Sequence, residues 1–166
     1  MLKLLIVDDE RIIRETMATI IDWNTLDIQL IGTAKDGIEA YNIILDEYPD
    51  IVLTDIKMPA LSGIELIAKI HEINPQTQFI ILSGYGEFEY AKKAMQYGVK
   101  HYLLKPCNEM QIVDSIKNIK KDYFQNITHF MKEDPETNIN VFHSIGVSIF
   151  TSCLSLPSDT CAFQNI

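Results

Sequence analysis

The chain has 166 residues, of which 47% are hydrophobic and 22% are charged. This composition is typical of a soluble globular protein with one domain of ordinary size and a short appendage. The formal net charge of -9 disfavours nonspecific binding of this chain to nucleic acid or to an anionic membrane surface. Its three cysteines are an odd number without metal-ligand spacing, so neither a disulfide framework nor a zinc site is expected.

The apolar run at the N-terminus is too short to form the core of a signal peptide. It ends at Val7, and the acidic residues Asp8, Asp9 and Glu10 follow directly. A secretory signal needs a longer uncharged core. We therefore expect a cytoplasmic protein.

Short apolar runs alternate with amphipathic stretches over the first three quarters of the chain. The apolar runs predict strands over 4–7, 28–33, 51–54, 79–82 and 101–104. Between them, apolar residues recur every three or four positions, which predicts helices over 11–21, 37–47, 63–72, 87–97 and 110–123. Ser62 and Asn108 are candidate caps of the helices that follow them. The alternation predicts an α/β fold of the (βα)5 type, a doubly wound five-stranded parallel sheet covered by helices on both faces.

The character of the sequence changes near its C-terminal quarter. Residues 125–166 contain only one basic and four acidic residues, and Asp134-Pro135-Glu136 indicates a linker. The stretch 139–158 has no charged residue, but its asparagine, histidine, proline and five serines make it marginal for a membrane span. We expect one domain over 1–124, followed by a linker and short tail over 125–166. The tail has no helix-turn-helix pattern, and we expect no membrane helix.

Charged side chains follow three of the predicted strands directly. Asp8 and Asp9 follow the first strand, Asp55 the third and Lys105 the fifth. Because the carboxyl ends of parallel strands share one edge, these groups should converge in one crevice. Neighbouring carboxylates repel one another, and Mg²⁺, a hard cation that prefers oxygen ligands, would relieve this repulsion. Lys105 and the hydroxyl of Ser83 could then bind phosphoryl oxygens, with Asp55 as a phosphoryl-accepting nucleophile.

Two other classes of phosphate chemistry fit the sequence less well. A glycine-rich phosphate loop is absent, which disfavours a P-loop nucleoside triphosphatase. The run Asp55-Ile56-Lys57 lacks a second carboxylate two positions after the first, which disfavours a phosphatase with an aspartate nucleophile. Each acidic or basic feature taken alone is more often a solvated turn. Their combination at the ends of different strands favours a site.

Five motifs resemble those of the receiver domain of two-component response regulators. They are Leu5-Ile6-Val7-Asp8-Asp9-Glu10, Asp50-Ile51-Val52-Leu53-Thr54-Asp55-Ile56-Lys57-Met58-Pro59, Ser62-Gly63, Ser83-Gly84-Tyr85 and Tyr102-Leu103-Leu104-Lys105-Pro106. The resemblance spans about residues 2–123. It implies the flavodoxin-like form of the fold, with strand order 2-1-3-4-5, the order for which chemotaxis receivers are a standard example.

The resemblance also implies roles for the acidic residues. Asp55 is similar to the phosphoacceptor, which receives its phosphoryl group from a sensor histidine kinase. Asp9 and Asp55, with Asp8 partly through water, would hold Mg²⁺ together with the backbone carbonyl of Lys57. Such a domain accepts and later loses a phosphoryl group but turns over no external metabolite.

Other residues of the motifs resemble the parts of a switch. Ser83 and Lys105 would bind phosphoryl oxygens, and Pro106 would follow a cis peptide bond. Tyr102 is similar to an aromatic residue that occupies the space vacated when Ser83 moves toward the phosphoryl group. The movement would alter the surface formed by the last two predicted helices and the strand between them, through which such domains commonly form homodimers.

Two segments, 21–24 and 83–94, resemble receivers that precede an AraC-type DNA-binding domain. This implies control of transcription, but the tail supplies no second domain of that kind, so we expect either a truncated regulator or a receiver that acts alone. Two functions remain open. The first is a signalling module switched by phosphorylation, and the second is a receiver-like interaction module that works without phosphorylation.

Overall fold

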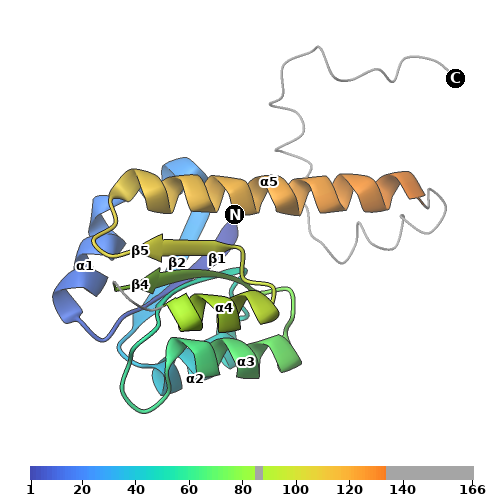
Figure 1. The fold of residues 1–166 in the computed structure, drawn as a ribbon. Helices are drawn as coiled ribbons and strands as arrows, with labels where there is room; N and C mark the ends of the chain where they lie inside the picture. Colours follow the sequence, from blue (N-terminus) through green and yellow to red (C-terminus); the bar gives the residue numbers. More distant parts are fainter. Residues whose placement is uncertain (85–87, 134–166) are drawn as a thin grey trace, which may run out of the picture. The chain divides into compact units, whose positions relative to one another are not determined.

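The computed structural model describes residues 1–84 and 88–133, which form an alternating series of strands and helices (Figure 1). The elements are β1 (Leu2–Val7), α1 (Arg11–Ile20), the 3-10 helix η1 (Trp23–Leu26), β2 (Ile28–Ala34), α2 (Gly37–Glu47), β3 (Ile51–Asp55), α3 (Gly63–Ile73), β4 (Gln78–Ser83), α4 (Phe88–Gln96), β5 (His101–Leu104) and α5 (Glu109–Glu133). The five strands form one parallel sheet in the order β2-β1-β3-β4-β5. The predicted (βα)5 fold and its strand order 2-1-3-4-5 are confirmed.

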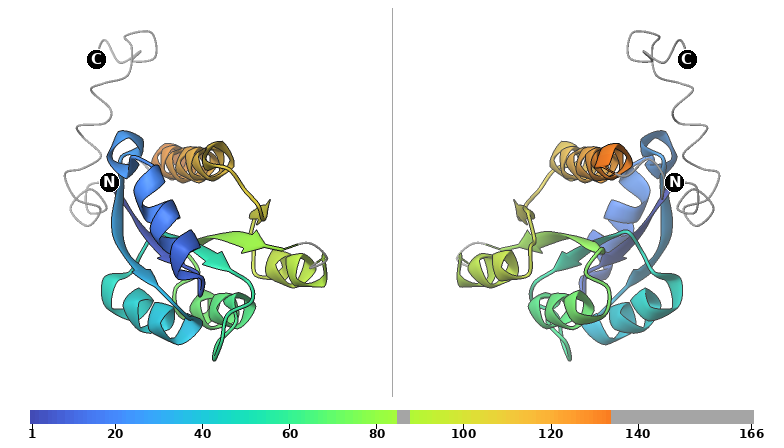
Figure 2. Two further views of the ribbon diagram at one scale, coloured as in Figure 1. Left: turned by 90° about the vertical axis from the view of Figure 1, so that its left-hand side faces the viewer. Right: turned by 90° about the vertical axis from the view of Figure 1, so that its right-hand side faces the viewer.

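The sheet lies between two layers of helices. α1 and α5 cover one face, and α2, α3 and α4 cover the other (Figure 2). Neighbouring residues of β1 and β3 alternate between the two cores: Leu5 and Val52 pack on the side of α2 and α3, and Ile6 and Leu53 on the side of α1 and α5. β3 is buried along its whole length, which explains why its sequence is a continuous apolar run up to Thr54.

The helix starts near the carboxyl edge of the sheet are fixed by caps. The Ser62 hydroxyl accepts a hydrogen bond from the Glu65 amide, and the Glu65 carboxylate accepts one from the Ser62 amide, so the two residues form a capping box at the start of α3. Asn108 accepts a hydrogen bond from the Gln111 amide at 3.0 Å. Both predicted caps are confirmed, and the loops that carry the candidate site are anchored by them.

Two features differ from the sequence-based expectation. A short 3-10 helix, η1, stands between α1 and β2, where the aromatic side chain of Trp23 is buried. The last helix does not end at residue 123 but continues to Glu133, because no glycine or proline interrupts the chain from Asn108 onward until Pro135. Residues 125–133, which the sequence left between the domain and the expected linker at 134–136, are therefore part of α5. The expected linker at Asp134-Pro135-Glu136 and the uncharged stretch 139–158 lie outside the described residues.

The chain divides into two units, Met1–Lys121 and Asp122–Ile166. The first contains the sheet and every charged residue that follows a strand. The described part of the second is the C-terminal portion of α5. None of the helices within residues 1–84 and 88–133 has the length and hydrophobicity of a membrane span.

Candidate functional site

Asp8 is fixed in the buried edge of the sheet by its own backbone and side chain. The residue follows β1 directly and is 0% exposed. Its amide donates a hydrogen bond to Ala34 at 3.1 Å, and its Oδ1 accepts one from the Glu10 amide at 2.9 Å. The second carboxylate oxygen, Oδ2, accepts a hydrogen bond from the Lys105 ammonium. Asp9, the next residue, is exposed.

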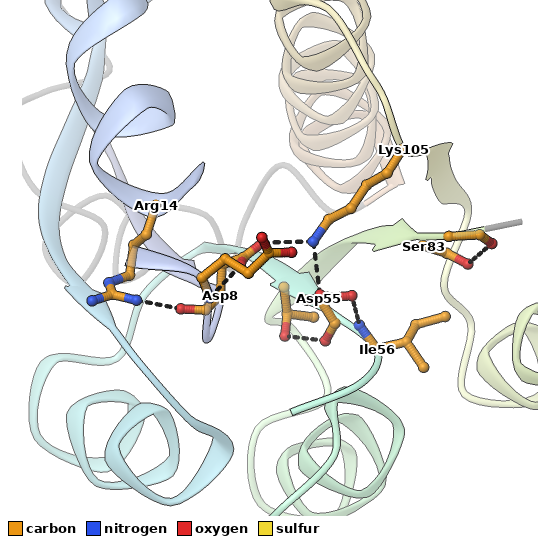
Figure 3. A network of polar contacts seen from close by, with 9 residues as sticks. Asp8, Arg14, Asp55, Ile56, Ser83 and Lys105 are labelled. Carbon is orange, nitrogen blue, oxygen red and sulfur yellow. Dashed lines mark hydrogen bonds and ion pairs between the residues drawn. The ribbon is translucent and has the colours of Figure 1, made fainter. Parts of the chain in front are cut away.

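Asp55 is the last residue of β3 and is 8% exposed. Its Oδ1 accepts a hydrogen bond from the Ile56 amide at 2.6 Å, which leaves Oδ2 directed at the Lys105 ammonium (Figure 3). Gly63, at the start of α3, packs on the backbone of Asp55: a Cβ atom at this glycine would lie 2.1 Å from the Asp55 carbonyl oxygen. Glycine is therefore required for α3 to begin so close to the site.

Lys105 joins the two buried carboxylates (Figure 3). Its Nζ donates to Asp8 Oδ2 at 2.8 Å and to Asp55 Oδ2 at 2.7 Å. The lysine amide donates to the Ser83 carbonyl at 2.7 Å, which places the residue at the edge of β4 and β5. The Lys105-Pro106 peptide bond is cis. Residues from three strands separated by up to 97 positions in sequence thus meet at one point.

Burial and ion pairing act in opposite directions on these groups. Burial raises the pKa of Asp8, and the hydrogen bond and positive charge of Lys105 only partly oppose this effect. Burial also acts to lower the pKa of Lys105, but the hydrogen bonds to Asp55 and Asp8 outweigh it and the pKa is raised. The ammonium form of Lys105 is therefore stabilised, whereas charge on Asp8 is costly without further positive charge nearby.

The three carboxylates form a group suited to a divalent cation. Asp8, Asp9 and Asp55 each offer an oxygen atom, and these atoms lie within 4.8 Å of one another. Oxygen donors of this kind are the ligands that Mg²⁺ prefers. When all three are ionised, the single ammonium of Lys105 does not balance their charge. The residues present therefore fit Mg²⁺. Lys57 lies two positions after Asp55 and is exposed.

Ser83 and Tyr102 lie together on the neighbouring strands β4 and β5. Ser83 ends β4 and is 0% exposed, and its hydroxyl donates to the Gly84 carbonyl at 3.0 Å. The same oxygen accepts a hydrogen bond from the Tyr102 hydroxyl at 2.5 Å. The half-buried tyrosine is thus connected directly to the serine that the sequence placed at the site. A movement of the Ser83 hydroxyl would therefore break or alter its hydrogen bond to Tyr102 on the edge strand β5.

Sequence reasoning missed one residue that contacts the acidic turn. Arg14, in the second turn of α1, donates from Nη1 to the Asp8 carbonyl at 2.5 Å (Figure 3). A basic residue one helical turn beyond the acidic run is a weak signal, because such residues are common on exposed helix faces. Its contact is to a backbone atom, which no sequence motif marks.

Comparison with known proteins gives a consistent result. Residues 4–117 match the response regulator receiver domain. YesN of Bacillus subtilis strain 168, described as an uncharacterized transcriptional regulatory protein, is 59% identical over 119 residues, which cover 72% of this chain and 32% of that protein. The transcriptional regulatory protein HptR of Staphylococcus aureus strain NCTC 8325 is 45% identical over 112 residues, covering 68% of this chain and 44% of HptR. The chain thus spans less than half the length of these curated relatives.

Solved structures show the same similarity in three dimensions. The receiver domain of AraT, a response regulator from Geobacillus stearothermophilus, is 35% identical with a TM-score of 0.71, and the match covers 75% of this chain and 97% of that one. A two-component transcriptional regulator AraC from Clostridium phytofermentans is 37% identical with a TM-score of 0.70 over the same shares of the two chains.

Proposed function

The chain belongs to the response regulator receiver domain family, and from this premise we propose that Asp55 accepts a phosphoryl group from a sensor histidine kinase. Receiver domains of two-component systems are signalling domains phosphorylated by such kinases. The observation that carries the assignment to Asp55 is its place between Asp8 and Lys105, with Oδ2 2.7 Å from the lysine ammonium. Phosphoryl transfer asks a protein mainly for positioning and charge neutralisation, and this arrangement provides both.

The other site residues have complementary roles in the proposal. Asp8, Asp9 and Asp55, with the backbone carbonyl of Lys57, hold Mg²⁺, whose positive charge neutralises phosphoryl oxygens when it is bound. Lys105 supplies a second positive charge. Ser83 donates a hydrogen bond, and its existing bond to Tyr102 supports a role for the tyrosine in relaying the change to the surface. The domain turns over no external metabolite.

The proposed output is a homodimer that controls transcription. Exposed apolar side chains on α4 and β5, Met95 at 67% and Leu104 at 48%, support pairing through the α4-β5-α5 surface. The relatives are transcriptional regulators of which this chain spans a part, so DNA binding is assigned to a region other than the receiver domain. A role between a kinase and DNA implies a cytoplasmic location.

The test is phosphorylation by acetyl phosphate in the presence of Mg²⁺, followed by intact-protein mass spectrometry. We expect the wild-type chain to gain the mass of one phosphoryl group and the Asp55→Asn variant to gain none. Asp46→Asn is the matched control, because it makes the same chemical change at an exposed aspartate of α2. A phosphoryl group that persists in Asp55→Asn would overturn the assignment.

One outcome would favour the alternative function. If the folded chain binds Mg²⁺ but takes no phosphoryl group from acetyl phosphate or from a histidine kinase, the domain is an interaction module that works without phosphorylation. The buried Asp8 and the shared Lys105 argue against this alternative, because a domain without the chemistry gains nothing from carboxylates held together.

A further inference from the structure

The start of α1 lacks the usual side-chain cap. Its N-cap residue, Glu10, makes no capping hydrogen bond through its side chain, and the Glu10 amide is bound instead to Asp8 Oδ1. A side chain in the second turn of α1 connects the helix to the preceding turn. Arg14 reaches back from the second turn of α1, and its Nη1 donates to the Asp8 carbonyl at 2.5 Å.

This contact acts on the segment that carries two of the three carboxylates. The side chain of Asp8 is held by Lys105 and by the Glu10 amide, whereas its carbonyl is held by Arg14 (Figure 3). A hydrogen bond from a guanidinium is charge-assisted and stronger than one between neutral groups. The bond therefore connects a rigid helix, α1, to the peptide group that joins Asp8 to Asp9 and so restrains both carboxylates.

We propose that Arg14 is a positioning residue that holds the turn of Asp8 and Asp9 in the geometry that binds Mg²⁺. The inference rests on the proposed function, since it concerns the same metal site. Groups that orient metal ligands without touching the metal strongly affect metal affinity. Arg14 acts in this way through the backbone of Asp8, and its contribution appears as tighter binding of Mg²⁺.

A positioning role and a purely electrostatic role of Arg14 predict opposite changes in Mg²⁺ affinity when the residue is replaced. If Arg14 acted only as a nearby positive charge, its neutralisation would reduce repulsion of the cation and Mg²⁺ would bind more tightly. If Arg14 positions the turn, its loss frees Asp8 and Asp9 and Mg²⁺ binds more weakly. The direction of the change therefore decides between the two roles.

The experiment is calorimetric titration of the purified chain with Mg²⁺. We expect Arg14→Met, which keeps the apolar stem of the side chain, to weaken binding about tenfold. Arg14→Lys keeps the charge and a donor but loses the planar fork, so we expect a smaller loss. The matched control is Arg11→Met, which removes the same charge from α1 at an exposed residue whose guanidinium pairs with Glu15 at 2.7 Å. We expect this control to bind Mg²⁺ at least as tightly as the wild type.

Unchanged or tighter binding by Arg14→Met would overturn the inference, as would an equal loss in Arg11→Met. Thermal unfolding in chelator establishes that each variant is folded, and Arg14→Lys carries the comparison if Arg14→Met is not. Phosphorylation is then measured against Mg²⁺ concentration, and the defect of Arg14→Met should diminish at saturating Mg²⁺. Failure of the wild type to take a phosphoryl group would count against the proposed function, whereas the Mg²⁺ affinities test Arg14 separately.

Discussion

At the scale of single residues, Asp8 shows how the site opposes the stability of its own fold. The carboxyl group is fully buried and has one ammonium partner, Lys105, which it shares with Asp55. Burial outweighs that partner and raises the pKa of Asp8. Without a bound cation, ionising the buried Asp8 carboxyl group therefore costs free energy. Such a cost is typical of functional sites that bind a cation.

This imbalance predicts a pH-dependent effect of Asp8→Asn. Because the pKa of Asp8 is higher in the folded chain than its ordinary value of 3.8, the folded state binds more protons than the unfolded state just above that value. The unfolding free energy of the wild type should therefore fall relative to that of Asp8→Asn as the pH rises from the ordinary pKa of Asp8 through its raised pKa in the folded chain. Urea unfolding in chelator measures the difference, and a pH-independent difference would contradict the prediction.

The backbone of Ala60 is strained. It lies in the loop between β3 and α3 with φ of 66°, a left-handed conformation that is unfavourable for alanine. We expect Ala60→Gly to raise the unfolding free energy by about 0.5–1 kcal/mol, the strain relieved less the added entropy of the unfolded chain. Ala68→Gly, inside α3, is the control and should lower it by about 1 kcal/mol. Equal effects of the two substitutions in denaturant unfolding would show that Ala60 is not strained.

Some residues of the site could be predicted from the sequence, and others are revealed only by the structure. Asp8, Asp55 and Lys105 could be predicted from sequence, because charged residues directly after apolar strands are conspicuous and parallel strands bring them to one edge. Gly63 belongs to a motif that the sequence shows, but its close approach to the Asp55 carbonyl does not follow from the motif, and Arg14 could not be found at all, because its contact is to the backbone carbonyl of Asp8. Contacts to backbone atoms depend on the folded path of the chain, which residue types alone do not reveal.

At the scale of elements, the start of α3 limits the position of β3, the strand that ends at Asp55. The Gly63 amide donates to the Ile56 carbonyl at 2.8 Å, and the space for a Cβ at Gly63 is filled by the Asp55 carbonyl. The capping box of Ser62 and Glu65 fixes the helix in this place. A shift of the start of α3 would therefore also shift the backbone of Asp55.

This close contact predicts a large effect of Gly63→Ala. The added methyl group would overlap the Asp55 carbonyl, so α3 or the end of β3 must move, and we expect the unfolding free energy to fall by about 1–3 kcal/mol. Phosphorylation by acetyl phosphate should slow as Asp55 shifts. Gly32→Ala in β2 is the control, because a Cβ there meets nothing within 4 Å, and it should leave both measurements nearly unchanged. A Gly63→Ala variant as stable and as reactive as the control would refute the argument.

Local pattern predicted the strands and most helices, but two elements depended on other information. η1 is short, and its buried Trp23 donates to the Ala18 carbonyl at 3.1 Å, a contact without a helical period. The extension of α5 to Glu133 follows from the lack of helix-breaking residues, whereas the predicted end relied on where the apolar pattern of the core weakens. Among the α5 residues whose burial the structure describes, up to 125, Ile119 is the last in the buried core, so the apolar period predicts where packing on the sheet ends and not where the helix ends.

At the scale of the whole molecule, we propose that the receiver domain ends near residue 124. The compact unit ends at Lys121, and the α5 residues that the structure describes as buried in the core precede it. A chain of residues 1–124 should therefore keep the unfolding free energy of the longer chain within about 1 kcal/mol and should still be phosphorylated on Asp55. Chemical unfolding and intact mass measure both properties. A large loss of stability would place part of the fold beyond residue 124.

Phosphorylation is expected to convert the monomer to a dimer through α4, β5 and α5. Met95 is exposed on α4 beside helix residues that face the core, and a lysine in its place would have to bury its charge in the proposed interface. We expect Met95→Lys to be phosphorylated normally while its dimer dissociation constant rises about tenfold or more. Light scattering after treatment with acetyl phosphate measures the mass. Ile73→Lys, at an exposed apolar residue of α3 outside this surface, should dimerise like the wild type. Loss of the dimer in Ile73→Lys but not in Met95→Lys would move the interface to α3, because each variant changes the charge of only one of the two surfaces.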